Sequence, residues 1–422
     1  MKRIPQPSLS IGWKKAPFAV LVSLMLLPIF LAPPSGAQTY HTIHAFAGGD
    51  GEQPSWMVMD SAGRLYGVTQ EGGPSTQCQD GCGVVYRLAH VGSGWIETIL
   101  YIFNGCSDGA VPDGLMIGRD GALYGTTQVG GSACAWAGNG TVFKLTPPAT
   151  ICRSVSCPWT ETVLYRFSSA SDGVYPLGLA MDANGNIFGS TINGGANTWG
   201  SVYELTRSDG SWNKTTLWAF TGDSDGGTPS SPVLLDTAGN VYGTTRFGGI
   251  GDGTVFKVSQ SNGVWTATAL HAFNRDSEGG IPVGLMFDSA GNLYGGTSEF
   301  GTGGGGTVYK LHPDSGNWTL SVLSNFPVPS GPFTLTMDPS GNLFGATEFG
   351  GGGFGSVFKL TNHNGIWART DLHDFGFSTG AYPDSNLLLD ANGNVIGSAL
   401  EGGFNNQCTN QDGCGVVWEI TP

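Results

Sequence analysis

Five acidic residues stand at equivalent positions of a sequence that repeats about every 53 residues, and each opens a loop of the form Asp/Glu-Gly-x-x-Pro. Carboxylates gathered on one face could bind Ca²⁺ or a polyhydroxyl ligand, and a pair about 5–9.5 Å apart could cleave a glycosidic bond. The simpler interpretation is that each carboxylate caps its own turn. Recurrence favours capping, because an acid and a base need two different roles. The five residues are Asp50, Asp108, Asp172, Asp225 and Glu278.

Aromatic residues in the same set of loops differ from repeat to repeat. Ligand sites favour variable loops on a rigid scaffold, so these side chains are candidates for stacking on a sugar ring. The alternative is that they pack against the neighbouring repeat. The candidates are Trp136, Tyr175, Trp199, Phe247 and Tyr382.

Other reactive patterns are weak. Residues 222–226 read Gly-Asp-Ser-Asp-Gly, but a nucleophile elbow needs a strand-to-helix turn and a His partner. His44, His271 and His373 share one repeat position on different strands, which separates them too far to share a metal. No zinc-protease or phosphate-loop motif is present. The sequence therefore predicts no catalytic residue, no metal site and no cofactor, with Ca²⁺ the one ion worth testing.

The eight cysteines form neighbouring pairs that predict disulfides rather than a metal cluster. Their spacings within separate loops fit zinc poorly, and an export signal makes disulfides the expected state. Cys106 and Cys134 fall in adjacent loops of one repeat. The predicted pairs are Cys78–Cys82, Cys106–Cys134, Cys152–Cys157 and Cys408–Cys414.

Residues 1–37 have the three parts of a secretory signal peptide. A basic segment precedes the apolar residues 18–32, and small residues at 35–37 precede a cleavage site. A membrane anchor is the alternative, but the apolar run is short for a span and Pro28 interrupts it. We expect a mature chain of residues 38–422 that is secreted, periplasmic or on the cell surface, with no membrane span.

Charge limits the partners of the mature chain. Removing residues 1–37 takes away four positive charges and no negative one, so the formal charge changes from −14 to −18. A surface this acidic is a poor partner for nucleic acid or anionic lipid. The expected partner is an extracellular ligand, either a polysaccharide or a protein.

The repeat predicts the fold. Each unit has four short strands separated by turns, and its fourth strand closes with Phe. Seven such units are typical of an all-β, seven-bladed β-propeller of four-stranded antiparallel blades. The first strand of each unit is apolar at consecutive positions, which predicts burial on both faces between blades. A Gly that recurs in every second strand indicates crowding between neighbouring sheets. The closing residues are Phe46, Phe103, Phe167, Phe220, Phe273, Phe326 and Phe375.

The two ends of the repeat predict how the ring closes. The chain ends just after a third strand, residues 416–420, so the last blade lacks its fourth strand. Residues 38–46 carry the pattern of a fourth strand without the other three. Pairing these two segments leaves no blade edge open. The sequence therefore predicts one propeller domain over residues 38–422, closed by its N-terminal strand.

The repeated motifs resemble those of the GloVer tandem-repeat family. The resemblance rests on Asp-Gly-x-x-Pro, Asp-x-x-Gly-Asn-Leu-Tyr-Gly-Thr-Thr and Gly-Thr-Val-Phe-Lys-Leu, which are best preserved in residues 216–258 and 269–311. It implies bacterial export and a propeller-like array, and it implies no reaction. Residues 330–332 depart from the pattern, since their loop is short and lacks the acidic residue.

These observations favour an exported scaffold that binds a ligand or partner, with a glycan as one candidate, through its loop-rich face. Two alternatives remain open: an extracytoplasmic hydrolase or lyase, and a purely structural surface protein. An enzyme would show one deep pocket where different polar groups converge. A scaffold would show a shallow, nearly symmetric face.

Overall fold

The structure is a computed structural model that describes residues 38–92, 94–134, 137–149, 159–403, 408 and 412–421. The predicted signal peptide, Trp136 and the predicted Cys152–Cys157 disulfide lie outside these residues. The described residues form strands and turns without a helix. Accordingly, no membrane-spanning helix occurs in this part of the chain.

The strands assemble into seven antiparallel sheets, named blades I to VII. Blades I and II contain β2 (Glu52–Met59), β3 (Leu65–Glu71), β4 (Val84–Val91), β5 (Gly94–Ile102), β6 (Ala110–Ile117), β7 (Leu123–Val129), β8 (Thr141–Thr146) and β9 (Thr160–Arg166). Blades III and IV contain β10 (Val174–Pro176), β11 (Ala180–Met181), β12 (Ile187–Asn193), β13 (Ser201–Ser208), β14 (Ser211–Ala219), β15 (Gly227–Pro229), β16 (Leu234–Leu235), β17 (Val241–Phe247), β18 (Thr254–Ser261) and β19 (Val264–Ala272). Blades V and VI contain β20 (Gly280–Phe287), β21 (Leu293–Glu299), β22 (Gly304–Asp314), β23 (Asn317–Pro327), β24 (Pro332–Met337), β25 (Leu343–Thr347), β26 (Ser356–His363) and β27 (Ile366–Asp374). Blade VII contains β28 (Leu388–Leu389), β29 (Val395–Ala399), β30 (Val416–Thr421) and β1 (Thr39–Ala45).

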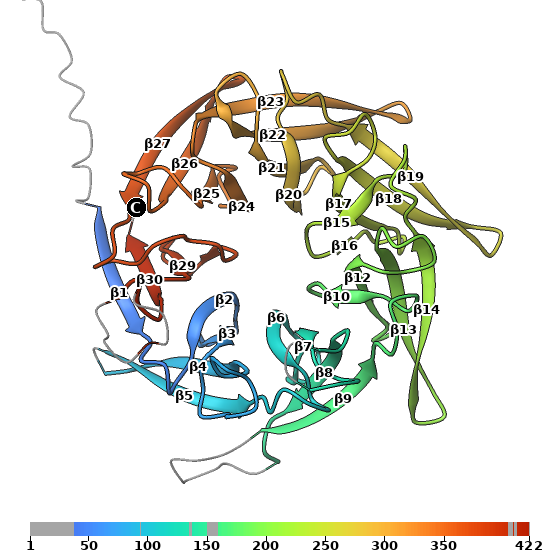
Figure 1. Cartoon of the computed structure of the whole chain (residues 1–422). Helices are drawn as coiled ribbons and strands as arrows, with labels where there is room; N and C mark the ends of the chain where they lie inside the picture. The colour runs from blue at the N-terminus through green and yellow to red at the C-terminus, as the bar shows by residue number, and fades with distance from the viewer. Residues whose placement is uncertain are drawn as a thin grey trace, which may run out of the picture. The chain divides into compact units, whose positions relative to one another are not determined.

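The blades surround a central channel, with the first strand of each blade innermost and the fourth at the rim (Figure 1). The predicted closure is confirmed, because β1 pairs antiparallel with β30 and Thr39 lies opposite Thr421. Side chains reinforce the closure. The Asn386 side-chain amide of blade VII donates to the Met57 carbonyl of blade I at 2.7 Å, and its Oδ1 accepts from the Met57 N–H at 2.9 Å.

Burial is greatest in the second and third strands rather than in the first. Every residue of β25 and β29 is buried, whereas half or more of the residues of β24 and β20 are only half-buried. The prediction that the innermost strands are buried on both faces is therefore wrong. Their inner edges line the channel, so part of each side chain faces open space instead of a neighbouring sheet.

The Gly that recurs in every second strand makes room for an aromatic ring. A Cβ added at any of the seven positions would lie 2.3–2.6 Å from the aromatic side chain opposite it in the third strand. Gly295 opposite Tyr309 and Gly397 opposite Trp418 are examples. The crowding that the sequence predicted is present, but it arises within each blade and not between blades.

The loop that carries the Asp-Gly-x-x-Pro motif in most repeats joins each blade to the one before it. The residue before the Pro adopts a left-handed backbone in all seven blades, with φ between 55° and 63°. In this conformation the N–H of Val111 donates to the carbonyl of Cys82, and that of Ile281 to the carbonyl of Asp252. The Pro ring then packs on a Gly of the preceding blade that has no room for a Cβ. Gln53 makes the same bond to the Cys414 carbonyl across the closure.

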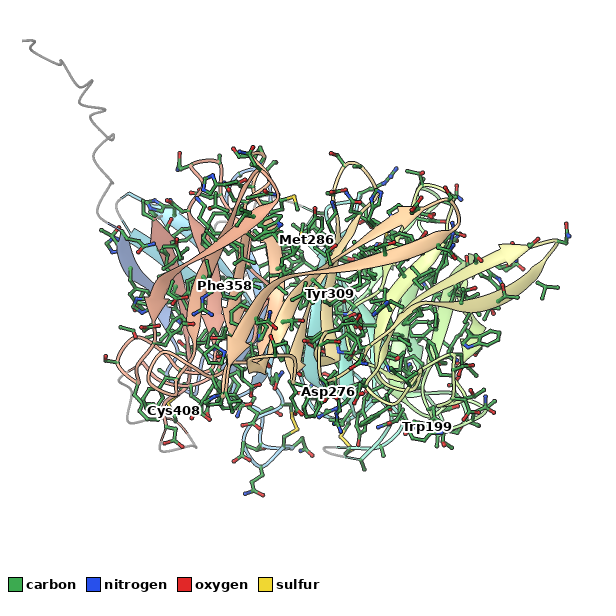
Figure 2. The ribbon with its side chains drawn as sticks, turned by 90° about the horizontal axis from the view of Figure 1, so that it is seen from above. Trp199, Asp276, Met286, Tyr309, Phe358 and Cys408 are labelled. Atoms are coloured by element: carbon green, nitrogen blue, oxygen red, sulfur yellow. A yellow bond between two sulfur atoms is a disulfide. The ribbon has the colours of Figure 1, made fainter. Side chains whose placement is uncertain are left out.

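Two sets of loops share one face of the ring, which we call the loop face. Figure 2 shows Trp199 and Cys408, from loops between second and third strands, on the same side as Asp276, from a loop between blades. Backbone hydrogen bonds link the two sets, such as Gly73 N–H to the Gly48 carbonyl at 2.8 Å.

Three of the predicted disulfides are confirmed, and all of them lie in these loops. They join Cys78 to Cys82, Cys106 to Cys134 and Cys408 to Cys414.

Candidate functional site

The five acidic loop residues make one and the same structural contact. Each carboxylate accepts a hydrogen bond from a backbone N–H of its own turn, as Asp225 does from Thr221 at 3.1 Å. Each also bonds the side chain that lies two positions before the closing Phe. These contacts are His44–Asp50 (3.1 Å), Tyr101–Asp108 (3.0 Å), Tyr165–Asp172 (2.9 Å), Trp218–Asp225 (3.0 Å) and His271–Glu278 (2.8 Å).

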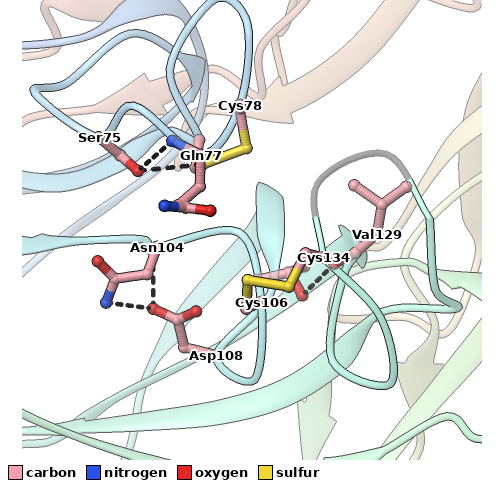
Figure 3. The surroundings of a disulfide bond; sticks show 10 residues. Ser75, Gln77, Cys78, Asn104, Cys106, Asp108, Val129 and Cys134 are labelled. Atoms are coloured by element: carbon pink, nitrogen blue, oxygen red, sulfur yellow. Dashed lines mark hydrogen bonds between the residues drawn. A yellow bond between two sulfur atoms is a disulfide. The ribbon is translucent and has the colours of Figure 1, made fainter.

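Asp108 shows this arrangement next to a disulfide. Its Oδ2 accepts from the backbone N–H of Asn104 at 2.8 Å and from the Asn104 side-chain amide, beside the Cys106–Cys134 bridge (Figure 3). Asp108 is only 5 % exposed, and its Oδ1 is buried without a hydrogen-bond partner. The carboxylate therefore stabilises the loop from within instead of facing solvent.

The acidic residues are spread over separate blades, and each is held by its own turn. Among the described residues, no group of three or more His, Cys, Asp or Glu side chains could hold a metal ion. Ca²⁺ binding stays a prediction. The pKa of Asp50 illustrates the local balance: burial raises it, but hydrogen bonds from His44 and from the Ala47 N–H outweigh burial and lower it.

Three of these carboxylates each face an ionisable side chain from the fourth strand of the next blade. In blade III the Lys214 ammonium lies 3.0 Å from Asp172. The same register holds Glu97 in blade I and Glu161 in blade II. Burial, together with the nearby Asp50 or Asp108, raises the pKa of each Glu to about 7, and one oxygen of each is buried without a hydrogen-bond partner.

The raised pKa values of Glu97 and Glu161 predict a pH-dependent stability. A carboxyl whose pKa is higher in the folded state takes up protons on folding, so stability falls as pH rises from about 4.5 to about 7. We expect the free energy of unfolding of the Glu97→Gln/Glu161→Gln variant to decrease less than that of the wild type over this pH range. At pH 8 it should be more stable than the wild type by about 1 kcal/mol per residue, after discounting for solvent screening.

Urea unfolding between pH 4.5 and pH 8 measures this difference, with Glu299→Gln, an exposed carboxyl, as the control. A double variant that follows the wild-type pH profile would contradict the assignment.

The structure brings some of the predicted aromatic residues together in pairs. Trp199 and Phe247, about 40 % exposed, meet edge to face with ring centroids 6.4 Å apart. Tyr382 meets Phe349 at 5.6 Å. Tyr175 packs against the core between blades I and II. Two of the four described candidates thus form an exposed aromatic surface on the loop face.

A cavity of about 660 Å³ opens among the loops of blades III to VI, and we call it the mouth cavity. Three aromatic rings line it, those of Phe300, Phe333 and Phe349. Phe349 is 37 % exposed. Charged groups of both signs also line the cavity. These charged residues are Arg246, Glu299 and Glu348.

A second cavity of about 450 Å³ lies in the channel itself, and we call it the channel cavity. It shares Leu177, Ser230 and Phe333 with the mouth cavity, and residues of all seven blades line it. Two carboxyls, Asp113 and Asp384, face an otherwise largely apolar wall.

Three carboxyls of these cavities, those of Asp113, Glu348 and Asp384, have raised pKa values. Burial raises the pKa of Asp384 well above its usual range, and the nearby Glu348 and Asp113 raise it further. Burial also raises the pKa of Glu348 and that of Asp113, although hydrogen bonds from Gln128 and the Gly114 N–H partly offset the shift in Asp113. Perturbed carboxyls in a concave, mostly apolar site are typical of binding and catalytic sites.

The sequence analysis missed both cavities. Their walls come from two irregular positions of the repeat: the residue after the Pro and the residue after the Thr of the second strand. The first position holds Ser55, Asp113, Leu177, Ser230, Val283, Phe333 and Asp384, and the second includes Gln70, Gln128, Ile192, Arg246, Ser298 and Glu348. An alignment of the repeats would have exposed this variation.

Comparisons with solved structures support the fold. The Staphylococcus aureus virginiamycin B lyase is 16 % identical, with a TM-score of 0.55 over 91 % of this chain and 99 % of that one. A streptogramin B lyase is 14 % identical, with a TM-score of 0.57 over 91 % and 97 %. The extracellular domain of the putative one-component system BT4673 from B. thetaiotaomicron is 13 % identical, with a TM-score of 0.53 over 90 % and 40 %. At such identities the likeness concerns the fold alone.

No curated protein matches the chain. A family match decides its membership, in agreement with the resemblance of its repeats. The Gloeobacter/Verrucomicrobia repeat matches residues 29–157 and 149–330, more than half of the sequence, and the protein belongs to this repeat family.

Proposed function

We propose that this propeller works outside the cytoplasm as a scaffold that binds a polysaccharide on its loop face, at the mouth cavity. The disulfides and the signal-like N-terminal segment support an extracytoplasmic location. The formal charge of −18 expected after cleavage favours a neutral or basic glycan over an anionic one.

The mouth cavity carries this proposal. Sugar rings bind where an apolar surface meets precisely placed hydrogen-bonding groups, and this cavity offers both. Phe300, Phe333 and Phe349 supply flat apolar faces, while Arg246 and Glu299 supply a donor and an acceptor at its wall. The Trp199–Phe247 pair provides a further exposed aromatic surface on the loop face.

The shape of the loop face argues against a purely structural role. A structural repeat array would present a nearly symmetric surface. The mouth cavity instead occupies only blades III to VI, and the residues that line it at equivalent positions differ from blade to blade. None of the five acidic loop residues themselves lines its wall. Recognition is therefore assigned to the irregular positions.

The test is binding of the full chain to a panel of neutral, basic and acidic polysaccharides by affinity electrophoresis, with and without Ca²⁺. Phe349→Ala should weaken binding of the recognised glycan about tenfold, which corresponds to about 1.4 kcal/mol, with little change in melting temperature because the ring is partly exposed. Ile366→Ala removes a 75 % exposed apolar side chain at the start of β27 and is the matched control. Equal binding by Phe349→Ala and the wild type would refute the proposal.

An acid–base enzyme that cleaves the bound glycan is the second candidate, and Glu348 is the observation that favours it. This carboxyl lines the mouth cavity, and burial raises its pKa, as a general acid requires. If the protein is an enzyme, the recognised polysaccharide should yield new reducing ends or unsaturated products, and Glu348→Gln should abolish them while glycan binding persists.

A further inference from the structure

The channel cavity has the walls of a small-molecule site. Its apolar surface comes from Trp56, Leu179, Val233, Leu285 and Leu387, on five different blades. Its polar groups are concentrated where blades VII, I and II meet, at Asp384, Ser55 and Asp113. The result is an apolar chamber with carboxyls on one side.

Asp384 has no partner that would balance a negative charge. Its Oδ1 is buried without a hydrogen-bond partner. The charged groups that act on it, Glu348 just after β25 and Asp113 in β6, are both acids, and both oppose its ionisation. Asp113 in turn accepts hydrogen bonds from the Gln128 side chain at 3.3 Å and from the Gly114 N–H, and neither donor carries a charge. A carboxylate in such a place requires a counter-charge.

Ser55 gives a second, independent observation that points to a ligand site. Its side chain is 4 % exposed, and its hydroxyl is buried without a hydrogen-bond partner. Buried hydroxyls usually have a partner, and an unpaired one costs about 1–3 kcal/mol. Ser55 lines the same cavity as Asp384, so one ligand could engage both groups.

The described walls of the cavity do not supply this counter-charge. None of the described residues that line the channel cavity is Lys, Arg or His. Arg246 lines the mouth cavity instead. Trp56 offers an aromatic ring, which attracts cations as well as apolar groups.

We propose that the channel cavity binds a small organic cation, a primary ammonium group on an apolar body. The ammonium lies between Asp384 and Asp113 and donates hydrogen bonds to their carboxylates and to the Ser55 hydroxyl. The apolar body packs against Leu179, Val233 and Leu285. This site adjoins the glycan site proposed for the mouth cavity and shares Leu177, Ser230 and Phe333 with it, but its polar groups are different and the proposal does not depend on glycan binding.

Proton release follows from this arrangement. Burial raises the pKa of both carboxyls, and the nearby acids Glu348 and Asp113 raise that of Asp384 further, so both groups hold their protons to higher pH than usual. An arriving ammonium favours their ionised forms, so binding expels protons to the solvent. Affinity should therefore rise as pH increases, until the amine itself loses its proton.

Isothermal titration of the full chain with cyclohexylmethylamine tests the proposal, and cyclohexylmethanol serves as the neutral probe of the same shape. We expect the amine to bind at least tenfold more tightly than the alcohol, with heats that differ between phosphate and Tris buffers because protons are released. Asp384→Asn and Asp113→Asn should each weaken amine binding at least tenfold and leave alcohol binding unchanged. Glu401→Gln, a half-buried acid outside the cavity, is the control.

Equal binding of amine and alcohol would overturn the proposal, as would buffer-independent heats. The comparison of probes and of buffers uses only the wild-type protein, so it remains decisive even if a variant fails to fold.

Discussion

Deleting residues 38–46 is expected to prevent the chain from forming the closed ring. This segment holds β1, which is the outer strand of blade VII, and Phe46, which is fully buried between blades VII and I. Its loss leaves β30 without its outer partner. Burial of Phe46, Ile43 and Tyr40 alone contributes about 5 kcal/mol or more, a large part of the 5–15 kcal/mol that stabilises a typical domain.

We expect the deletion variant to lose the cooperative thermal transition seen by circular dichroism and to elute as aggregates in size-exclusion chromatography. Asn386→Ala is a milder test of the same closure, since it removes both hydrogen bonds to Met57. It should lower the free energy of unfolding by about 1–3 kcal/mol. A deletion variant with wild-type melting behaviour would show that the N-terminal strand does not close the ring.

Gly295→Ala is expected to destabilise the protein severely. The added Cβ would lie 2.4 Å from the hydroxyl oxygen of Tyr309, which is fully buried, and 2.7 Å from the Gly284 carbonyl oxygen. Neither neighbour can move freely, because Tyr309 packs in the core between blades IV and V. Overpacking of this kind costs about 1–3 kcal/mol and sometimes more, and we expect at least 3 kcal/mol in chemical denaturation.

Gly94→Ala is the matched control, because Gly94 also lies in a strand but has open space around the site of its Cβ. It should change the unfolding free energy by less than about 0.5 kcal/mol. The Gly295→Ala/Tyr309→Leu double variant should be more stable than the sum of the two single changes predicts. Additive effects would contradict steric crowding by Tyr309.

The regular positions of the repeat were sufficient to predict the architecture. The spacing of the closing Phe residues, the position of residues 38–46 and the ending after a third strand together specify a closed ring of seven blades. These features are predictable because every copy of a repeat must satisfy the same packing, so a constraint is visible seven times. The pairing of three disulfides could be predicted for a similar reason, since each pair lies in adjacent or identical loops.

The physical reason for a repeated residue was harder to infer than its importance. The recurring Gly indicated crowding, but the sequence cannot show that the neighbour is an aromatic ring one strand away. Likewise, Asp50 and Glu278 stand out as possible ligand groups, while their actual partners, His44 and His271, are six and seven residues earlier on a different element. A contact across a turn becomes evident only when both elements are placed.

The cavities could not be found by looking for recurrence. Asp113 and Asp384 occupy a position that is Leu, Ser, Val or Phe in other blades, so each seemed an exception to the repeat. Only closure of the ring brings residues 271 positions apart in the chain to one channel wall. In this protein the repeated residues form the ring, and the residues that vary between repeats line its cavities.

The channel cavity is lined by all seven blades and therefore depends on closure of the ring, so the register of the β1–β30 pairing is the most direct point to test. His41 lies opposite Glu419 in the antiparallel ladder, where directly opposite side chains have Cβ atoms about 4.5–5.5 Å apart. The measurement is peptide mapping by mass spectrometry of the His41→Cys/Glu419→Cys variant after oxidation. We predict a disulfide between positions 41 and 419, and none in His41→Cys/Ile420→Cys, whose side chains point to opposite faces of the sheet. A cross-link in the second variant but not in the first, or in neither, would contradict the closed ring described above.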